Sequence, residues 1–386
     1  MTTNSVQTSK VLLAGICSLI LTVGLARFAY TPLLPVMRVE TWLTEVAGGW
    51  LATFNYMGYM SGALLAASIS SLHLKYQLYR AGLVVAVLSV VGMGLTDNMW
   101  LWSILRYLAG LTSAAGLLIG SGLMLNWLMR NGHRPELGIH FGGLGGGILV
   151  SGLVSVAMLA AGLDWAQQWW TLGLLGTLLF IPAWLWLPEP APSHAQAAVT
   201  QAPPSRRWLL LMIAMYFCAG VGFVVSATFT VAMAEKIPSL QGLGSWVWVL
   251  VGVAATPACF VWDRVSRRIG DLSALQWAFA GQIIAIVLPA ISDHPLVAMS
   301  SAALYGATFI GIVSLTLTVI GRLYPANPAK AMARLTLSYG VAQIIAPAIT
   351  GYIAEATGSY QGGLLMAAGF MLLGMVLLWQ IRVLKV

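Results

Sequence analysis

The chain has 386 residues, of which 59% are hydrophobic and only 8% are charged, and its formal net charge is +8 at pH 7. This composition excludes a soluble domain, whose surface needs far more charge, and indicates a polytopic helical membrane protein. In so apolar a chain the positive balance is typical of basic cytoplasmic loops. We therefore expect the lipid bilayer as a partner and no nucleic acid.

Twelve apolar segments are each long enough to cross a bilayer, which requires ~20 apolar residues in a helix. In chain order the predicted spans are Val11–Pro35, Val46–Ser70, Tyr79–Leu95, Met99–Trp127, Leu137–Ala161, Trp165–Leu187, Trp208–Ala234, Trp246–Trp262, Leu272–Ile291, Leu296–Leu323, Leu335–Ala356 and Gly362–Ile381. The first apolar run is too long for the hydrophobic part of a signal peptide and lacks a clear cleavage site, so we expect an uncleaved helix.

The loop charges predict the orientation of these spans. With the N-terminus in the cytoplasm, fifteen lysines and arginines fall on the cytoplasmic side and two, Arg38 and Lys236, on the outer side. The remaining two of the 19, Arg27 and Arg106, lie inside predicted spans. This bias follows the positive-inside rule and predicts an even number of spans with both termini in the cytoplasm.

A polar, proline-rich segment over 188–207 divides the spans into two groups of six. It predicts a cytoplasmic linker between an N-terminal bundle, 1–187, and a C-terminal bundle, 208–386. The halves also resemble each other weakly, because an offset of 198 residues carries Gly24 onto Gly222 and other short matches have nearly the same offset. An offset close to half the chain length indicates duplication, as in carriers built from parallel repeats.

Two local motifs resemble those of the major facilitator superfamily. The run Asp263-Arg264-Val265-Ser266-Arg267-Arg268 follows the eighth span and is similar to the family's loop signature, Gly-x-x-x-Asp-Arg-x-Gly-Arg-Arg. It departs from that signature in having Cys259 for the leading glycine and Ser266 for the second. Arg106-x-x-x-Gly110 in the fourth span is similar to the family's buried-arginine motif.

Three further stretches resemble the YbfB/YjiJ-like bacterial branch of that superfamily. They are Arg27-Phe28-Ala29-Tyr30-Thr31-Pro32-Leu33-Leu34-Pro35, Asn55-Tyr56-Met57-Gly58-Tyr59, and Gly220-Val221-Gly222-Phe223 with Ala227-Thr228-Phe229. The resemblance spans the whole chain. It implies an all-α integral membrane protein of twelve helices in two pseudo-symmetric six-helix bundles, a transport function and the bacterial inner membrane. It implies little about the substrate.

The two arginines inside predicted spans are the strongest candidates for a functional site. A charge at that depth is expensive in hydrocarbon, so it marks a site that faces the bundle interior or a wet cavity. The resemblance implies that the first, fourth, seventh and tenth spans line a central cavity, which would place Arg27 and Arg106 there. Two guanidiniums can hold a carboxylate or phosphonate bidentately. The alternative is that each caps backbone carbonyls or a kink and never meets substrate.

Other polar and aromatic residues in the spans are candidates for substrate contact, and for each the alternative is simple packing. These residues are Tyr30, Asn55, Tyr216, Tyr305 and Thr308. No Asp or Glu falls at mid-membrane, which disfavours organic cations, favours anionic or neutral substrates and removes the usual carboxylate proton relay. His140 is the only histidine inside a predicted span and is the candidate proton carrier. Its alternative role is a hydrogen bond to a neighbouring helix.

The loop signature predicts a cytoplasmic gate made by Asp263, Arg264, Arg267 and Arg268. By the family's pseudo-symmetry, Asp263 should face the start of the fifth helix near 135–137, where a helix N-terminus favours a carboxylate. The sequence contains no nucleophile–base pair and no cluster with metal-ligand spacing. We therefore expect no enzyme activity, no cofactor and no metal.

Taken together, these features predict a secondary carrier that moves a small organic anion or amphiphile by alternating access, acting as a monomer. Export is the expected direction, because a monovalent anion that leaves a negative interior gains ~2.3 kcal/mol per 100 mV. Two alternatives remain open. One is a proton-coupled multidrug or neutral-solute antiporter, and the other is a membrane receptor or scaffold that does not transport.

Overall fold

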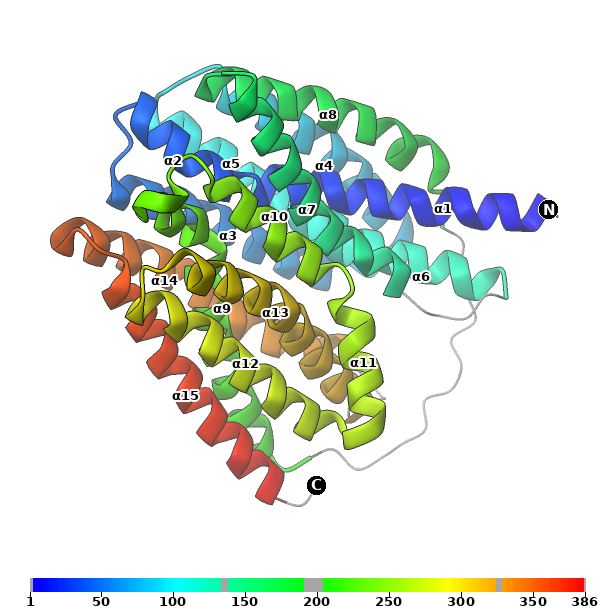
Figure 1. The fold of residues 1–386 in the computed structure, drawn as a ribbon. Helices are drawn as coiled ribbons and strands as arrows, with labels where there is room; N and C mark the ends of the chain where they lie inside the picture. The colour runs from blue at the N-terminus through cyan, green and yellow to red at the C-terminus, as the bar shows by residue number, and fades with distance from the viewer. Residues whose placement is uncertain (1–2, 133–137, 191–203, 324–327, 385–386) are drawn as a thin grey trace. The chain divides into compact units, whose positions relative to one another are not determined.

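The computed structural model describes residues 3–132, 138–190, 204–323 and 328–384, and in these residues the chain forms helices joined by turns and loops, without strands (Figure 1). The predicted all-α membrane fold is confirmed. Contacts divide the chain into two units. The first contains Met1–Trp42 and Phe54–Ala195, and the second contains Leu43–Thr53 and Gln196–Val386.

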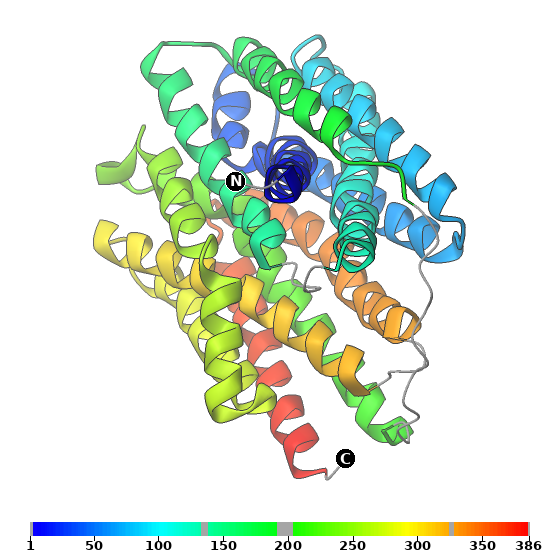
Figure 2. The same ribbon diagram turned by 90° about the vertical axis from the view of Figure 1, so that its right-hand side faces the viewer.

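The helices of the first half of the chain follow the first six predicted spans. They are α1 (Thr3–Leu19), η1 (Ile20–Phe28), α2 (Tyr30–Glu40), α3 (Glu45–Ser68), α4 (Leu72–Met93), α5 (Met99–Ala114), η2 (Ala115–Gly120), α6 (Ser121–Arg130), α7 (Gly138–Ala160) and α8 (Trp165–Trp186). Two spans are composite, because α1, η1 and α2 follow one another without a loop, as do α5, η2 and α6. In both, the middle segment is a π-helix. Figure 2 shows α1 end-on among the helices of its unit.

The second half follows the remaining spans. Its elements are α9 (Arg206–Glu235), η3 (Pro238–Leu240), α10 (Gly244–Ala255), α11 (Ala258–Ile269), α12 (Asp271–Ile291), α13 (Pro295–Leu323), α14 (Pro328–Thr357) and α15 (Gln361–Val383). Within this unit α12 packs against both α13 and α15, and the three helices run side by side (Figure 1).

The eighth span differs from its prediction in length and shape. It consists of α10 and α11, which are bent by 42° relative to each other at a break that contains Pro257. The predicted end was Trp262, but the helix continues to Ile269, so the motif 263–268 is helical and not a loop. Arg267 and Arg268 in the last turn favour this extension, because cations stabilise a helix C-terminus.

Ten helical segments of the described residues are long and apolar enough to cross a membrane, and the bent pair α10–α11 makes an eleventh. The helix α3 is not among them. It has 24 residues, which at ~1.5 Å per residue is enough to span the hydrocarbon, but its glycines, Asn55 and tyrosines lower its hydropathy. The same residues that weaken its membrane signal take part in the packing and polar contacts described below.

Capping side chains and glycines mark several of the helix ends. Asp164 caps α8, because its carboxylate accepts from the Gln167 amide while the Gln167 side chain accepts from the Asp164 amide. The side chain of Asn98 accepts from the first amides of α5. Gly162, two residues after the end of α7, and Gly270, directly after α11, adopt positive φ values of 68° and 86°, a conformation that glycine adopts without a steric penalty.

Glycines bring the backbones of α3 and α5 into direct contact within the first unit. A methyl group at Gly110 would lie 1.8 Å from the Asn55 carbonyl oxygen, and one at Gly58 would lie 1.9 Å from that of Tyr107. Small residues allow such close approach between membrane helices, where packing and polar contacts replace the hydrophobic effect as the source of association. This contact fixes Asn55 and the residues after it beside α5.

We expect Gly110→Ala to lower the apparent melting temperature of the purified protein. The added methyl would strike a backbone atom, and forcing extra volume into a packed contact costs about 1–3 kcal/mol. Gly142→Ala is the matched control, since a methyl group at that position would have no atom within 4 Å and alanine is the better helix former. Equal melting of the two variants in a detergent thermal-unfolding assay would show that the α3–α5 contact is not tight.

Candidate functional site

The first unit centres on the π-helical segment η1, which carries Arg27. Its wider turn is closed by a bond from the Ala29 amide to the Gly24 carbonyl (2.8 Å), five residues apart. Such a turn interrupts the regular bonding of the helix, and π-bulges occur frequently at functional sites. In a membrane the carbonyls released by the interruption need donors from the protein, because no water is available in the hydrocarbon.

Arg106, from α5, supplies two of these donors. Its Nη1 donates to the Ala26 carbonyl (2.9 Å) and its Nη2 to the Arg27 carbonyl (3.4 Å). The guanidinium carbon also lies 4.4 Å from the ring centre of Tyr30. Arg106 is only 2% exposed. Its planar fork is therefore occupied mainly by backbone, which is the capping role that the sequence left as the alternative.

Two further hydrogen bonds tie the neighbouring helices to the same segment. Asn55 Nδ2 donates to the Arg106 carbonyl (2.9 Å), which links α3 to α5. Ser113 Oγ donates to the Thr22 carbonyl (2.6 Å), which links α5 to η1. The structure thus brings four sequence-predicted residues together in one network, namely Arg27, Tyr30, Asn55 and Arg106.

Arg27 is held by aromatic rings. Its guanidinium carbon lies 4.4 Å from the ring centre of Tyr59, 4.7 Å from that of Tyr56 and 5.4 Å from that of Phe28. The side chain is 6% exposed, and among the described residues no carboxylate forms an ion pair with it. Its Nε has no acceptor there either. We call Arg27 with these three rings the arginine box.

Sequence reasoning missed Tyr56 and Tyr59 as members of the site. Both belong to the stretch 55–59, which the sequence singled out only through its family resemblance. Their spacing of three residues places them on one face of α3, and that pattern beside Asn55 was an available signal. The contact between that face and Arg27 had no signal in the sequence, because it depends on where α3 packs.

The predicted residues of the second unit form a separate aromatic cluster. Tyr216 stacks on Tyr339 (4.5 Å between ring centres), Tyr339 approaches Phe223 (5.7 Å), and Tyr305 stacks on Phe309 (5.1 Å). Tyr305 also donates its hydroxyl to the Phe223 carbonyl (3.0 Å). These rings come from α9, α13 and α14, so Tyr216 and Tyr305 are indeed brought together.

Thr308 contacts that cluster through the backbone, since its hydroxyl donates to the Tyr305 carbonyl (3.2 Å). Its hydroxyl bonds to Gln282 of α12 and to the Leu304 carbonyl one turn back in its own helix. The residue is 2% exposed. In this arrangement Thr308 contributes to the packing of α12 against α13.

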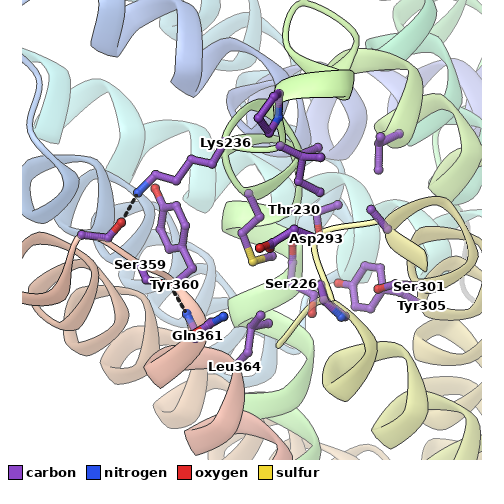
Figure 3. A pocket seen from close by; sticks show the side chains of 18 residues that line it. Ser226, Thr230, Lys236, Asp293, Ser301, Tyr305, Ser359, Tyr360, Gln361 and Leu364 are labelled. Atoms are coloured by element: carbon purple, nitrogen blue, oxygen red, sulfur yellow. Dashed lines mark hydrogen bonds between the residues drawn. The ribbon is translucent and has the colours of Figure 1, made fainter. Parts of the chain in front are cut away.

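A cavity of about 250 Å³ opens beside the aromatic cluster, between α9, α12, α13 and α15 of the second unit. Figure 3 shows Ser301 and Tyr305 together on one side of it, and Lys236 and Tyr360 on another. The ammonium of Lys236 donates to the Gly358 carbonyl (3.1 Å) and lies 4.5 Å from the Tyr360 ring centre. The lining of the cavity therefore combines hydroxyl groups and aromatic rings with one lysine and one aspartate.

Glu45, a further acid of the second unit, contacts two residues of the cavity lining, Lys236 and Tyr360. It is 7% exposed, accepts a hydrogen bond from the Tyr360 hydroxyl, and pairs with Lys236 Nζ at 3.2 Å. Glu45 is not among the candidate residues of the sequence analysis. Its partners are distant in sequence, which is why the pattern did not reveal them.

His140 is fully buried in the first unit. Its Nε2 is 2.9 Å from Ser121 Oγ, at the point where the π-helix η2 ends and α6 begins. Its Nδ1 has no partner among the described residues and faces Gly15 of α1. The imidazole thus fills a space that glycine leaves open and forms one inter-helix hydrogen bond.

The gate residues lie on α11. Asp263 pairs with Arg267 one turn along the helix (2.7 Å), and both side chains are largely exposed. The segment 135–137, which was expected to face Asp263, lies outside the described residues. The gate role of Asp263, Arg264, Arg267 and Arg268 therefore stays a prediction.

Helical spans in two units, with charged and aromatic residues buried inside the spans, define a polytopic membrane protein with a polar interior. The sequence model of the family described as "Uncharacterised MFS-type transporter YbfB" matches residues 19–379. The chain therefore belongs to this family of the major facilitator superfamily, and it is a transporter by family. The predicted resemblance to the YbfB-like branch is confirmed.

Relatives and solved structures agree with this assignment. "Uncharacterized MFS-type transporter YcaD" of Escherichia coli is 24% identical over 364 residues, which cover 90% of this chain and 89% of YcaD. "Uncharacterized transporter mfc1" of Schizosaccharomyces pombe is 23% identical over 138 residues, and the match spans only 28% of that protein. The crystal structure of nucleoside transporter NupG aligns with a TM-score of 0.74 over 98% of this chain and 100% of NupG, at 14% identity. That structural likeness shows the fold.

We expect Arg106→Met to destabilise the fold. The substitution would leave the Ala26 and Arg27 carbonyls without donors, and each unsatisfied buried group costs about 1–3 kcal/mol. Arg106→Lys should recover part of the loss, because an ammonium cannot reproduce the fork of a guanidinium. The apparent melting temperature is the readout, with Arg130→Gln, an arginine at the end of α6, as the control. Parental melting of Arg106→Met would contradict the capping role.

Proposed function

We propose that this transporter moves a small organic anion or amphiphile out of the bacterial cytoplasm by alternating access. It would act as a monomer in the inner membrane with both termini in the cytoplasm. The observation that carries this proposal is the arginine box, which holds a buried cation on aromatic faces and not on a carboxylate. Efflux follows from the membrane potential, which drives an anion out of a negative interior.

The way in which the charge of Arg27 is compensated supports an anionic ligand. A guanidinium over an aromatic face gains about 0.5–2 kcal/mol per ring, far less than its desolvation costs. A carboxylate in the protein would neutralise the charge, but none forms an ion pair with Arg27 among the described residues. The rings thus stabilise the cation without cancelling its field, which leaves Arg27 able to bind a mobile anion.

The neighbouring residues have separate roles in this proposal. Arg106 holds the carbonyl of Arg27 and so positions its backbone. Asn55 fixes Arg106 from α3. Tyr56 and Tyr59 supply apolar faces on which the organic part of an amphiphilic anion can pack. Because Arg27 is 6% exposed, an entering ligand must displace part of the arginine box.

A second candidate function is transport of a neutral solute or a drug-like molecule in exchange for protons. The aromatic cluster of Tyr216, Tyr339, Phe223 and Tyr305 favours it, as does the hydroxyl-lined cavity of the second unit. Stacked rings with nearby hydroxyl groups suit an uncharged ring-bearing solute. In that case Arg27 would be a structural residue and its loss would leave transport intact.

We expect Arg27→Gln to weaken the binding of an anionic substrate by about 1.5–3 kcal/mol, the scale of a charge-assisted hydrogen bond, or roughly tenfold or more in affinity. Arg27→Lys should restore only part of it, because lysine lacks the bidentate geometry. Purified protein is screened by thermal shift against carboxylates, phosphonates, sugars and lipophilic cations, since ligands stabilise the state that they bind. Binding of the hits is then measured in both variants.

The effect must be specific to anions, so a neutral analogue should bind the parent and both variants alike. Arg130→Gln, which removes an exposed positive charge at the end of α6, serves as the folding control. If Arg27→Gln folds normally yet binds and transports the anion with parental affinity, the anion proposal fails and the neutral-solute candidate moves ahead. Binding without flux in proteoliposomes would instead favour a receptor.

If the transporter carries protons, we expect His140→Gln to flatten the pH dependence of transport, since histidine ordinarily titrates near neutrality. Ser121→Ala is the companion variant, because it removes the hydrogen-bond partner but keeps the imidazole. It should therefore retain a pH-dependent profile. Uptake into proteoliposomes is measured from about pH 5.5 to about pH 8, a range that brackets the ordinary pKa of histidine. A parental profile in His140→Gln would leave His140 as a packing residue and favour transport driven by potential or exchange.

A further inference from the structure

A second cavity, of about 430 Å³, lies at the opposite end of the second unit from the cavity of Figure 3. It sits where α9 and α12 begin and where α13 and α15 end. Its wall includes Trp208, Asp271, Leu272, Arg322 and Arg382. In the orientation proposed above, this end of the helices is cytoplasmic.

The charged groups of this cavity leave a positive excess. Arg322 Nη1 pairs with Asp271 Oδ2 (2.8 Å), and the other oxygen of Asp271 accepts from the Ser266 hydroxyl. Arg382 forms no ion pair with an acid of the described residues and donates Nη1 to the amide oxygen of Gln276 (2.7 Å). With two arginines and one aspartate on its wall, the cavity carries one uncompensated positive charge.

Unused hydrogen-bond donors add to this charge. Trp208 is 1% exposed, and its indole Nε1 has no acceptor among the described residues. A buried donor without a partner costs free energy, so an occupant of the cavity that accepts from it would be favoured. The first turn of α12 forms another part of the wall and has no side-chain cap, so its free amides also favour an anion.

The surface next to the cavity is apolar and exposed. Trp379 lies three residues before Arg382 on α15, and Trp277 lies four residues after Ser273 on α12, so each is one turn from the cavity wall on the same helix face. They are 60% and 67% exposed. Exposed tryptophans at the ends of membrane helices are typical of the lipid interface. An anion at this site would therefore be adjacent to acyl chains.

We propose that this cavity binds the phosphate headgroup of an anionic phospholipid from the cytoplasmic leaflet. Arg382 and Trp208 donate to the phosphate, the first turn of α12 favours its charge, and Trp277 and Trp379 pack along the acyl chains. Basic pockets between membrane helices on the cytoplasmic side are suited to such headgroups. The site lies in one unit and is independent of the substrate proposed above.

The test measures binding of phosphatidylglycerol to the delipidated full-length protein in detergent by native mass spectrometry. We expect Arg382→Gln to weaken the apparent affinity about tenfold, because it removes a charged donor to the phosphate. Trp208→Phe keeps the ring but removes the donor, and it should weaken binding by about fivefold. Arg206→Gln is the matched control, since it removes an exposed positive charge near the start of α9 from a residue that does not line the cavity.

The apparent lipid affinities of the three variants decide whether the site is correct. Parental lipid affinity in both Arg382→Gln and Trp208→Phe, or an equal loss in Arg206→Gln, would overturn the site. Soluble glycerol phosphate is added as a competitor at the same concentration. Failure to displace the lipid supports a phospholipid ligand, whereas full displacement would show that the cavity takes free phosphate and not lipid. Should Arg382→Gln melt at a lower temperature, Trp208→Phe alone carries the comparison.

Discussion

The hydrogen bonds from Arg106 to the backbone of the π-helical segment are the interaction on which the first unit depends. The π-turn over Ile20–Phe28 withdraws carbonyls from regular helix bonding, and the hydrocarbon offers no water to replace the lost donors. Arg106 brings a fixed fork of donors to two adjacent carbonyls, those of Ala26 and Arg27. The irregular turn and the buried charge therefore stabilise each other, since each would be costly alone.

The two buried arginines, which the sequence could only treat as a pair, have different surroundings in the structure. The guanidinium of Arg106 is directed at backbone, whereas that of Arg27 lies among aromatic rings. A carrier must release its ligand, so a guanidinium held by ring faces suits repeated binding better than one that donates to two backbone carbonyls. The geometry assigns Arg106 to positioning and leaves Arg27 for the ligand in the proposed mechanism.

The second unit uses polar groups differently. Its described spans bury hydroxyl groups and stacked tyrosines. Its ionic contacts gather at the helix ends, as with Arg322 and Asp271 or Lys236 and the buried Glu45. Helix ends lie near the headgroups, where charges are hydrated at little cost. The described interiors of the two units therefore differ in their chemistry.

The sequence by itself determined the class of membrane protein, the helical spans and the burial of two arginines. Hydropathy and charge are local properties, and each span must match the bilayer through its own residues. The surroundings of Arg27 were decided only by tertiary structure. A π-turn changes which face the later residues occupy, so the regular 3.6-residue period misplaces them. Tyr56 and Tyr59 reach Arg27 because Gly58 and Gly110 let α3 and α5 touch, and a contact between distant segments has no local signature. The helical form of the motif at 263–268 likewise depended on the break at Pro257, after which α11 begins, and on the motif's own Arg267 and Arg268 in the last turn of that helix.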